Sequence, residues 1–228
     1  MKLEKLEEAI GYTFRNKELL KIAMTHTSYA NEHNCESNEK LEFLGDSILE
    51  FVSSDYIYRT YAKLKEGEMT KVRATVVCEN CLHRIAQRLN FSDFLYVGKS
   101  ETQNYGNKRP AVMADSVEAV IAAIYFDGGL EKAKDFIISI LKDEIETATH
   151  EVGMKDYKTV LQEILQVHGD VKIEYILNKT DGPDHNKTFY TEVRCNGETL
   201  AHGVGKSKKT AEMLAAQKAI EKIKEKKG

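Results

Sequence analysis

The sequence lacks tryptophan altogether, contains only two prolines and four cysteines, and has no long hydrophobic run. Four cysteines in 228 residues are too few for a disulfide-stabilised scaffold and suit a reducing compartment. The longest uninterrupted apolar run, residues 119–126, is far shorter than the roughly 18 residues that a membrane-spanning helix needs. The charged N-terminus shows no signal-peptide segment. We therefore expect a cytoplasmic protein with no membrane partner.

The net charge of −3 hides a difference between the two parts of the chain. Residues 1–153 carry a net charge of −6, whereas residues 154–228 carry +3. From Lys206 onward, eight lysines stand against three glutamates. A small basic module on an acidic body suggests a polyanionic partner.

The first 150 residues show the apolar spacing of helices almost throughout. Only one proline, Pro110, interrupts this region, and Gly128-Gly129 marks a helix end. We predict a mostly α-helical domain over residues 1–150. Residues 151–155 are the predicted linker, because this short segment contains a glycine and lies where the charge changes sign.

Residues 156–226 follow a different pattern. A helix is predicted over 157–167, three β-like runs over 172–177, 188–194 and 199–204, and an alanine-rich helix over 208–224. Asn196-Gly197, between the second and third runs, is a strong signal for a β-hairpin. The prediction is a small α+β domain in the order helix, three antiparallel strands, helix.

Carboxylates interrupt two otherwise apolar stretches of the first domain. In NEKLEFLGDSIL, residues 38–49, Glu39, Glu42 and Asp46 are three and four residues apart and share one face of a helix. In AVMADSVEAVIAAIYF, residues 111–126, Asp115 and Glu118 are the only charged residues and lie one turn apart. Acids are seldom buried without a partner. Any one of them could cap a helix or pair with a surface lysine, but no basic residue adjoins the second pair.

Two facing pairs of buried carboxylates would repel each other and be driven toward protonation, unless a cation lay between them. Magnesium takes hard oxygen ligands, usually a few carboxylates together with water and substrate phosphate. Such an ion makes hydroxide available near neutral pH and neutralises charge on a phosphate. We therefore interpret four acids as a metal site for phosphoryl chemistry: Glu42, Asp46, Asp115 and Glu118.

Three lysines, Lys206, Lys208 and Lys209, surround the predicted start of the last helix. The backbone amides and the dipole of a helix N-terminus attract phosphate, whereas lysine side chains there oppose the dipole. A bound polyanion would compensate for that repulsion. The alternative interpretation is a solvated lysine cluster.

The stretch NEKLEFLGDSIL resembles the signature of the ribonuclease III family of double-stranded-RNA endonucleases. The segments THTSYANE (25–32), GEMT (67–70) and DSVEAVIAAIYFDGG (115–129) support the resemblance. The C-terminal module, with HGVGKSKKTAE at 202–212, is similar to a double-stranded-RNA-binding domain. The resemblance implies an all-helical nuclease domain that forms a homodimer, in which the acidic cluster of each subunit cuts one strand.

The resemblance also implies roles for individual residues. Asp46 matches the acid that acts with Glu118 at the catalytic centre, where it orients the attacking water. The family's metal ligands are matched by Glu42, Asp115 and Glu118. Two secondary acids lining an RNA-binding valley are matched by Glu39 and Glu68. Residues of the second domain that face the minor groove of RNA are matched by Thr159, Gln162, Glu163 and His185, beside the lysines named above.

The implied activity is Mg²⁺-dependent hydrolysis of double-stranded RNA, with Mn²⁺ able to substitute, leaving 5′-phosphate and 3′-hydroxyl ends. Precursors of rRNA, and some of mRNA and tRNA, are the implied substrates. The alternative is a catalytically silent double-stranded-RNA-binding protein, and the intact acidic set favours the enzyme. A metal phosphohydrolase of small nucleotides would leave the second domain unexplained.

Cys78-x-x-Cys81 lacks a second pair and lies in a helical pattern, so we do not interpret it as a zinc site.

Overall fold

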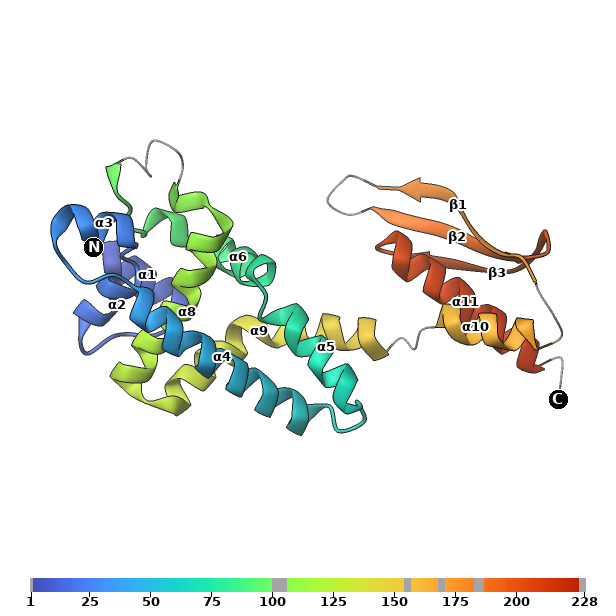
Figure 1. Cartoon of the computed structure of the whole chain (residues 1–228), viewed down its shortest axis with the longest axis horizontal. Coiled ribbons are helices and arrows are strands. Elements are labelled where there is room, and N and C mark those ends of the chain that lie inside the picture. Colours follow the sequence, from blue (N-terminus) through green and yellow to red (C-terminus); the bar gives the residue numbers. More distant parts are fainter. Residues whose placement is uncertain (1, 100–105, 154–156, 168–170, 183–186, 226–228) are drawn as a thin grey trace. The chain divides into compact units, whose positions relative to one another are not determined.

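The computed structural model describes residues 2–99, 106–153, 157–167, 171–182 and 187–225 (Figure 1). The chain divides into two compact units, Met1–His150 and Glu151–Gly228. No helix among the described residues is long and apolar enough to cross a membrane.

The described part of the first unit consists mainly of helices (Figure 1). In chain order they are α1 (Lys2–Ile10), α2 (Lys17–Ala23), α3 (Thr27–His33), α4 (Glu39–Thr60), α5 (Glu66–Val76), α6 (Glu79–Arg88), the 3₁₀ turns η1 (Phe91–Asp93) and η2 (Gly106–Lys108), α8 (Pro110–Gly128) and α9 (Leu130–Gly153).

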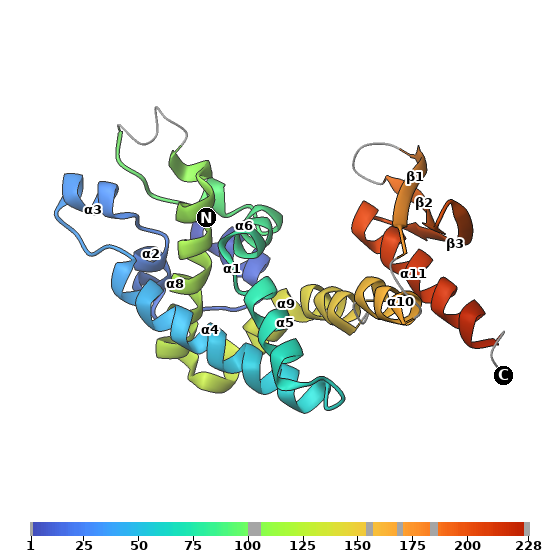
Figure 2. The same cartoon turned by 45° about the vertical axis from the view of Figure 1, so that its right-hand side comes forward.

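Helix α8 forms the centre of this unit. It is apolar on nearly every side, which is typical of a helix enclosed by others. Its residues Val117, Ile121 and Ile124 are fully buried, and α4, α6 and α2 pack against it. Helix α4 crosses α8, as the two views show (Figures 1 and 2). The backbone under any side chain that projects from α8 at this crossing is therefore fixed by a packed core.

The second unit has the predicted α+β order. It contains α10 (Tyr157–Gln166), β1 (Ile173–Asp181), β2 (Thr188–Cys195), β3 (Glu198–Gly205) and α11 (Lys208–Glu225). The strands form an antiparallel sheet in the order β1-β2-β3. The core lies between one face of this sheet and the two helices, and its buried members are Leu161, Val193, Ala201, Ala215, Ala216, Ala219 and Ile220. The fold class predicted from the sequence is confirmed.

The hairpin between β2 and β3 is also confirmed. Asn196 and Gly197 both have positive φ, +50° and +87°, as a two-residue turn of the favoured hairpin type requires. Strand β1 is longer than predicted and continues to Asp181, because its polar end pairs with Tyr190, Phe189 and Thr188 of β2. Helix α9 likewise runs on to Gly153, so the first three residues of the predicted linker are helical.

Candidate metal centre and RNA-binding surface

Helix α4 carries the first group of acids. The backbone N–H of Glu42 donates to the carbonyl of Asn38 (2.9 Å), which fixes the first turn. Glu39 and Glu42 lie in that turn, where the positive end of the helix dipole favours carboxylates. Asp46 follows one turn later on the same face.

Helix α8 carries the second group. Pro110 occupies its first turn, a position where proline costs no hydrogen bond. Asp115 and Glu118 follow at a spacing of three residues, and their neighbours Ala114, Val117 and Ala119 are buried. Because those neighbours face the core, the two carboxylates reach the surface only at the edge of the crossing.

Gly45 lies at the contact between the two helices. A Cβ atom built on Gly45 would lie 1.9 Å from the carbonyl oxygen of Glu118 and 3.1 Å from its Cα. Only a residue without a side chain allows this approach. Gly45 therefore lets α4 lie directly on the turn of α8 that carries Glu118.

Three carboxylates converge at this crossing. Oxygens of Glu42, Asp115 and Glu118 all lie within 4.8 Å of one another, and the three side chains are half-buried. Within the described part of the chain, no lysine or arginine forms an ion pair with any of them. Burial raises the pKa of Glu118 to about 8, and the charges of Asp46, Asp115 and Glu42 add to this rise. Burial likewise raises the pKa of Glu42, with a further contribution from Asp115.

These carboxylates form a suitable donor set for a divalent cation. They offer hard oxygen ligands, they lie close enough to share one ion, and no lysine or arginine in the described ranges forms an ion pair with them. A cation held here would offset the burial and the mutual repulsion that raise both pKa values. Three of the four predicted acids, carried by two separate helices, thus meet at a site that fits a metal.

Asp46 lies beside the three clustered carboxylates and is not part of their group. Its side chain is exposed, yet among charged groups its effect on the pKa of Glu118 is the largest. Asp46 lines a surface cavity of about 440 Å³ between α4 and α5, together with Ser47, Glu50, Phe51, Ser54 and Arg73. The fourth predicted acid therefore faces an open space next to the cluster, where a substrate or a water molecule has access.

The two secondary acids differ from each other. Glu39 is exposed, accepts a hydrogen bond from the Ser37 hydroxyl (3.1 Å) and contributes to the raised pKa of Glu42. Glu68 belongs to α5, and its carboxylate accepts the backbone N–H of Lys65 (2.7 Å). This bond closes the start of α5, so the structure shows a capping role for Glu68.

The basic residues of the second unit surround the start of α11. The Ser207 hydroxyl accepts the backbone N–H of Thr210 (3.1 Å) and caps the helix. Lys206, Lys208 and Lys209 are exposed around this cap. Lys208 lies 4.0 Å from Glu212, one turn further along.

Helix α10 is tied to this end of α11 by an ion pair between Lys158 and Glu212. Thr159, Gln162 and Glu163, the predicted contacts on α10, are all exposed. His185, the predicted contact in the loop before β2, lies outside the described residues. The ion pair therefore joins the two helices that carry the predicted contacts.

Two family models match this chain. A ribonuclease-III-like model matches residues 16–144, and a double-stranded RNA binding motif matches residues 157–223. Ribonuclease 3 of Clostridium perfringens is 44% identical over 222 residues, covering 97% of this chain and 94% of the relative. Ribonuclease 3 of Listeria monocytogenes is 45% identical over 223 residues, covering 96% of this chain and 97% of the relative. The chain belongs to the ribonuclease III family.

A solved structure supports the same assignment for the first unit. The nuclease domain of ribonuclease III from Campylobacter jejuni has 37% sequence identity and a TM-score of 0.59, covering 62% of this chain and 97% of that one. This ribonuclease III family member is thus an endoribonuclease, and its C-terminal unit carries a double-stranded-RNA-binding motif.

The sequence patterns of this ribonuclease III family member did not point to Gly45, because a glycine has no side chain that could bind a metal or react. The glycine stands three residues after Glu42 and one before Asp46. A glycine inside a 22-residue helix lowers the stability of the helix. Its presence there therefore indicates that another segment packs closely against the backbone at this position.

The cysteines form no metal site among the described residues, where the three carboxylates are the only such group of His, Cys, Asp or Glu side chains. All four cysteines are free. Cys78 is exposed at the start of α6, whereas Cys81 is buried and burial raises its pKa to about 12. The helical pattern predicted for this segment therefore holds for Cys81, which lies within α6, but not for Cys78, which lies between α5 and α6.

Proposed function

We propose that this ribonuclease III family member cleaves double-stranded RNA with the help of Mg²⁺, leaving 5′-phosphate and 3′-hydroxyl ends. The observation that carries the proposal is the convergence of three uncompensated carboxylates next to the exposed Asp46. A protein that only held RNA would have no need to bring acids together beside a polyanion.

Glu42, Asp115 and Glu118 would hold the cation, and Mn²⁺ would substitute because it also accepts carboxylate oxygens. When bound, the ion supplies positive charge that lowers the pKa of water and stabilises the phosphate. The side chains supply the geometry. Two ligands come from the central helix α8 and one from α4, so their separation is set by helix packing.

Asp46 has the role of orienting the water that attacks. Its carboxylate lies at the open side of the cluster, where it can accept a hydrogen bond from water. The water oxygen forms a bond to phosphorus while the bond from phosphorus to the 3′ oxygen breaks. The 3′ oxygen takes up a proton, which gives the 3′-hydroxyl, and the phosphate stays on the 5′ end.

The second unit would bind the duplex by shape. Double-stranded RNA is contacted through 2′-hydroxyls in its wide minor groove and through phosphates across the major groove. The Gln162 amide can both donate to and accept from a 2′-hydroxyl. Lys206, Lys208 and Lys209 would contact phosphates together with the N-terminus of α11. Because these contacts read shape, structured precursors of rRNA, mRNA and tRNA in the cytoplasm are suitable substrates.

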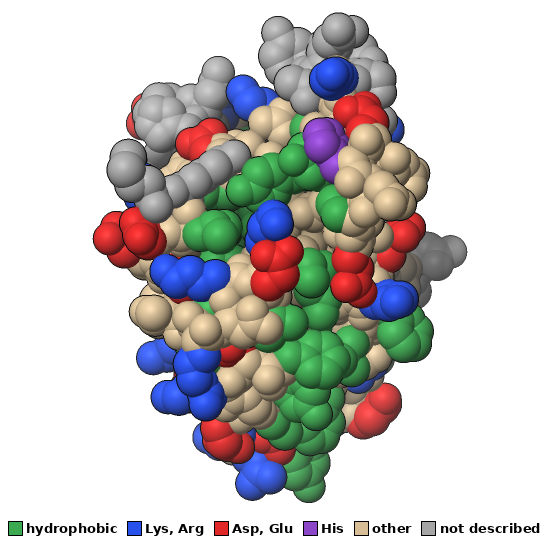
Figure 3. All heavy atoms as spheres, turned by 90° about the vertical axis from the view of Figure 1, so that its left-hand side faces the viewer, with side chains coloured by type: hydrophobic (Ala, Val, Ile, Leu, Met, Phe, Trp, Pro, Cys, Tyr) green, Lys and Arg blue, Asp and Glu red, His purple; other side chains and the backbone are tan. Residues whose placement is uncertain are grey.

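A second copy of the chain is the proposed partner of the nuclease unit. Large hydrophobic side chains of α4 are exposed: 78% for Phe43, 60% for Phe51 and 71% for Tyr58. Their spacing of eight and seven residues places them on one side of the helix, next to the side that carries the acids. Hydrophobic side chains also gather on the face drawn in Figure 3.

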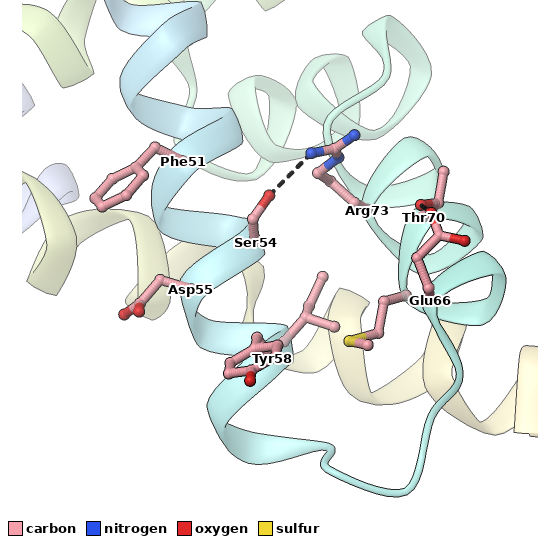
Figure 4. A pocket seen from close by; sticks show the side chains of 9 residues that line it. Phe51, Ser54, Asp55, Tyr58, Glu66, Thr70 and Arg73 are labelled. Carbon is pink, nitrogen blue, oxygen red and sulfur yellow. Dashed lines mark hydrogen bonds between the residues drawn. The ribbon is translucent and has the colours of Figure 1, made fainter.

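A cavity between α4 and α5 adjoins this exposed row. It measures about 380 Å³, and its lining includes Phe51, Ser54, Tyr58, Met69 and Arg73 (Figure 4). Arg73 donates to the Ser54 hydroxyl (3.0 Å) at one side of it. Exposed aromatic residues and a neighbouring cavity support a homodimer, in which each copy would cut one strand.

The proposal is tested with purified protein and a long RNA duplex. Cleavage is expected with Mg²⁺, none with EDTA, and products should accept ligation through a 5′-phosphate. Replacing Glu118 with Gln removes a ligand charge at constant shape and should slow cleavage on the order of a thousandfold or more. Duplex binding, measured by gel shift with Ca²⁺, should be unchanged. Cleavage by Glu118→Gln at the parental rate would contradict the assigned site.

A further inference from the structure

Glu212, on the second turn of α11, carries a carboxylate that the proposed RNA contacts do not explain. Its side chain is only 12% exposed, although it lies one turn after the exposed Lys208. Charged side chains are seldom buried unless they are paired. An acid at this place also opposes the positive charge that would attract RNA, so its presence needs a physical reason.

The partner of Glu212 is Lys158, in the first turn of α10. The two side chains form an ion pair between residues that lie 54 positions apart in the chain. Lys158 is 35% exposed, compared with 62% for Lys208. Its ammonium group lies 4.3 Å from the centre of the Tyr175 ring on β1, which is a cation–π contact. Lys158 is therefore held between α11 and the sheet.

This ion pair holds the first turn of α10 on a helix that is already fixed. The buried residues Ala215, Ala216 and Ala219 fix α11 in the core under the sheet. Helix α10 lies beside α11 (Figures 1 and 2), and Leu161 is its one buried residue. The contacts of Lys158 add a polar tie one turn before Leu161, at the end of α10 that precedes the proposed RNA contacts.

The two helices carry the two sets of proposed RNA contacts. Thr159 follows Lys158 directly and Gln162 stands one turn later, and both are exposed. Duplex RNA presents 2′-hydroxyls in a wide minor groove and phosphates across a narrow major groove. In B-form DNA the major groove is the wide one. A protein that contacts both features of RNA must therefore keep its two sets of contacts at the separation that the A-form helix sets.

We propose that Glu212 is a positioning residue for duplex RNA. Through its ion pair with Lys158 it fixes the separation between the minor-groove contacts of α10 and the phosphate contacts of α11, and so favours A-form RNA over B-form DNA. This inference rests on the proposed duplex binding by the second unit. Removal of an acid beside phosphate contacts would, by charge alone, strengthen binding to either duplex. The positioning role predicts weaker binding to RNA, so the two explanations differ in sign.

The test compares RNA and DNA duplexes of matching sequence and of about 20 base pairs, long enough for two minor grooves and the major groove between them. Binding to the full chain is measured by gel shift with Ca²⁺, and unfolding is followed by circular dichroism. Glu212→Met removes the acceptor but keeps side-chain length and helix propensity. Glu221→Met is the matched control, because it removes the same charge from an exposed position on the same helix.

A double variant tests the pair itself. Lys158→Glu/Glu212→Lys exchanges the two charges and keeps the net charge of the parent. An effect that depends on the pair should be restored by the exchange, whereas an effect of net charge is absent from it.

Glu212→Met should bind RNA about tenfold more weakly than the parent and DNA within about twofold of it. Glu221→Met should keep the parental preference for RNA, and the exchange variant should recover that preference to within about threefold. RNA binding by Glu212→Met at the parental strength or tighter overturns the inference, as does equal weakening for both duplexes. Should Glu212→Met unfold, the exchange variant decides, because its failure to recover the preference also overturns the inference. A parent that binds both duplexes equally would instead overturn the proposed duplex-RNA binding.

Discussion

Each unit brings a helix against its neighbour through a glycine, but the two contacts serve different ends. In the first unit, Gly45 of α4 lies against the backbone of Glu118 in α8. In the second, Gly203 of β3 lies against α11, where a Cβ atom would come within 2.0 Å of the Ala211 carbonyl oxygen. Both contacts exclude any side chain. They differ in what lies beside them.

Beside Gly45 lie half-buried carboxylates that nothing in the described chain neutralises. Beside Gly203 lie the alanines of α11, which form the core under the sheet. The lysines proposed to contact RNA are exposed at the start of α11. The first unit thus places its acidic cluster at the packing contact, whereas the second packs a core there and carries these lysines in solvent. Substitution at the two glycines should therefore have different consequences.

The largest effect is expected for Gly45→Ala. The added methyl group must push α4 away from α8, because the atom it meets belongs to the backbone. Overpacking of this kind costs roughly 1–3 kcal/mol, and displacement of the ligands by about 1 Å should slow cleavage on the order of a hundredfold. Cleavage of a duplex under saturating Mg²⁺ and thermal unfolding measure the two effects.

Gly67→Ala is the control for this variant. Gly67 also lies in a helix, α5, and a Cβ atom built there meets nothing within 4 Å. It should cleave at the parental rate and be as stable or slightly more so. Equal rates for Gly45→Ala and Gly67→Ala would show that the crossing does not set the catalytic geometry.

A smaller effect on cleavage is expected for Gly203→Ala. Here the methyl group meets the backbone of Ala211 and Ala215, so the second unit should lose roughly 1–3 kcal/mol of stability. Duplex binding should weaken with it. The nuclease unit keeps its geometry, so turnover at saturating RNA should stay near the parental value. Amide NMR spectra would show changes confined to residues after 156; a slower chemical step would contradict the separation of the two roles.

A still smaller effect is expected for removal of surface charge. Lys208→Ala/Lys209→Ala should weaken duplex binding roughly tenfold. The slope of the logarithm of the binding constant against the logarithm of the salt concentration should become less steep by about one per lysine. The matched control, Lys218→Ala/Lys224→Ala, removes the same charge from the C-terminal half of α11. Equal losses for the two double variants would mean that net charge, and not the position at the helix start, determines binding.

The sequence allowed much of this comparison to be predicted. Periodicity and the Asn196-Gly197 turn were enough for the fold of the second unit, because its signals are local. The convergence of acids could be predicted because acids inside apolar helices are unusual enough to need a reason. The division between three clustered carboxylates and an exposed Asp46 could not be predicted, since it depends on how two helices cross.

Other features depended on contacts that no local pattern encodes. The closeness of Gly45 to Glu118 joins residues 73 positions apart. Glu68 matched a family acid by position, but the hydrogen bond to Lys65 that caps α5 becomes visible only in the folded helix. Packing at a distance decided the contact of Gly45, whereas the capping bond of Glu68 is local and was overlooked because the residue matched a family acid.

The last prediction uses pH to distinguish the two units in the cation-free protein. In the first, the pKa of Glu118 rises from an ordinary 4.5 to about 8. A carboxyl group with a raised folded-state pKa contributes stability that is present below pH 4.5 and lost as the pH rises through 8. In the second, burial alone would raise the pKa of Glu192, yet Asn178 and Arg194 bring it below its usual value. Its contribution is present at neutral pH and lost as the pH falls.

With EDTA, the unfolding temperature of the first unit should therefore fall by a few degrees between pH 6 and pH 9, while that of the second should fall only in acid. Calorimetry with residue-specific NMR assigns each transition. The side chain in Glu118→Gln has no proton to lose, so the unfolding temperature of the first unit should change less between pH 6 and pH 9. Adding Mn²⁺ at pH 8 should restore the unfolding temperature of the parent but should not raise that of this variant. The reason is that the ion replaces the proton that the three carboxylates would otherwise share. A first unit that gains stability between pH 6 and pH 9 without metal would show that the carboxylates do not repel one another as their positions imply.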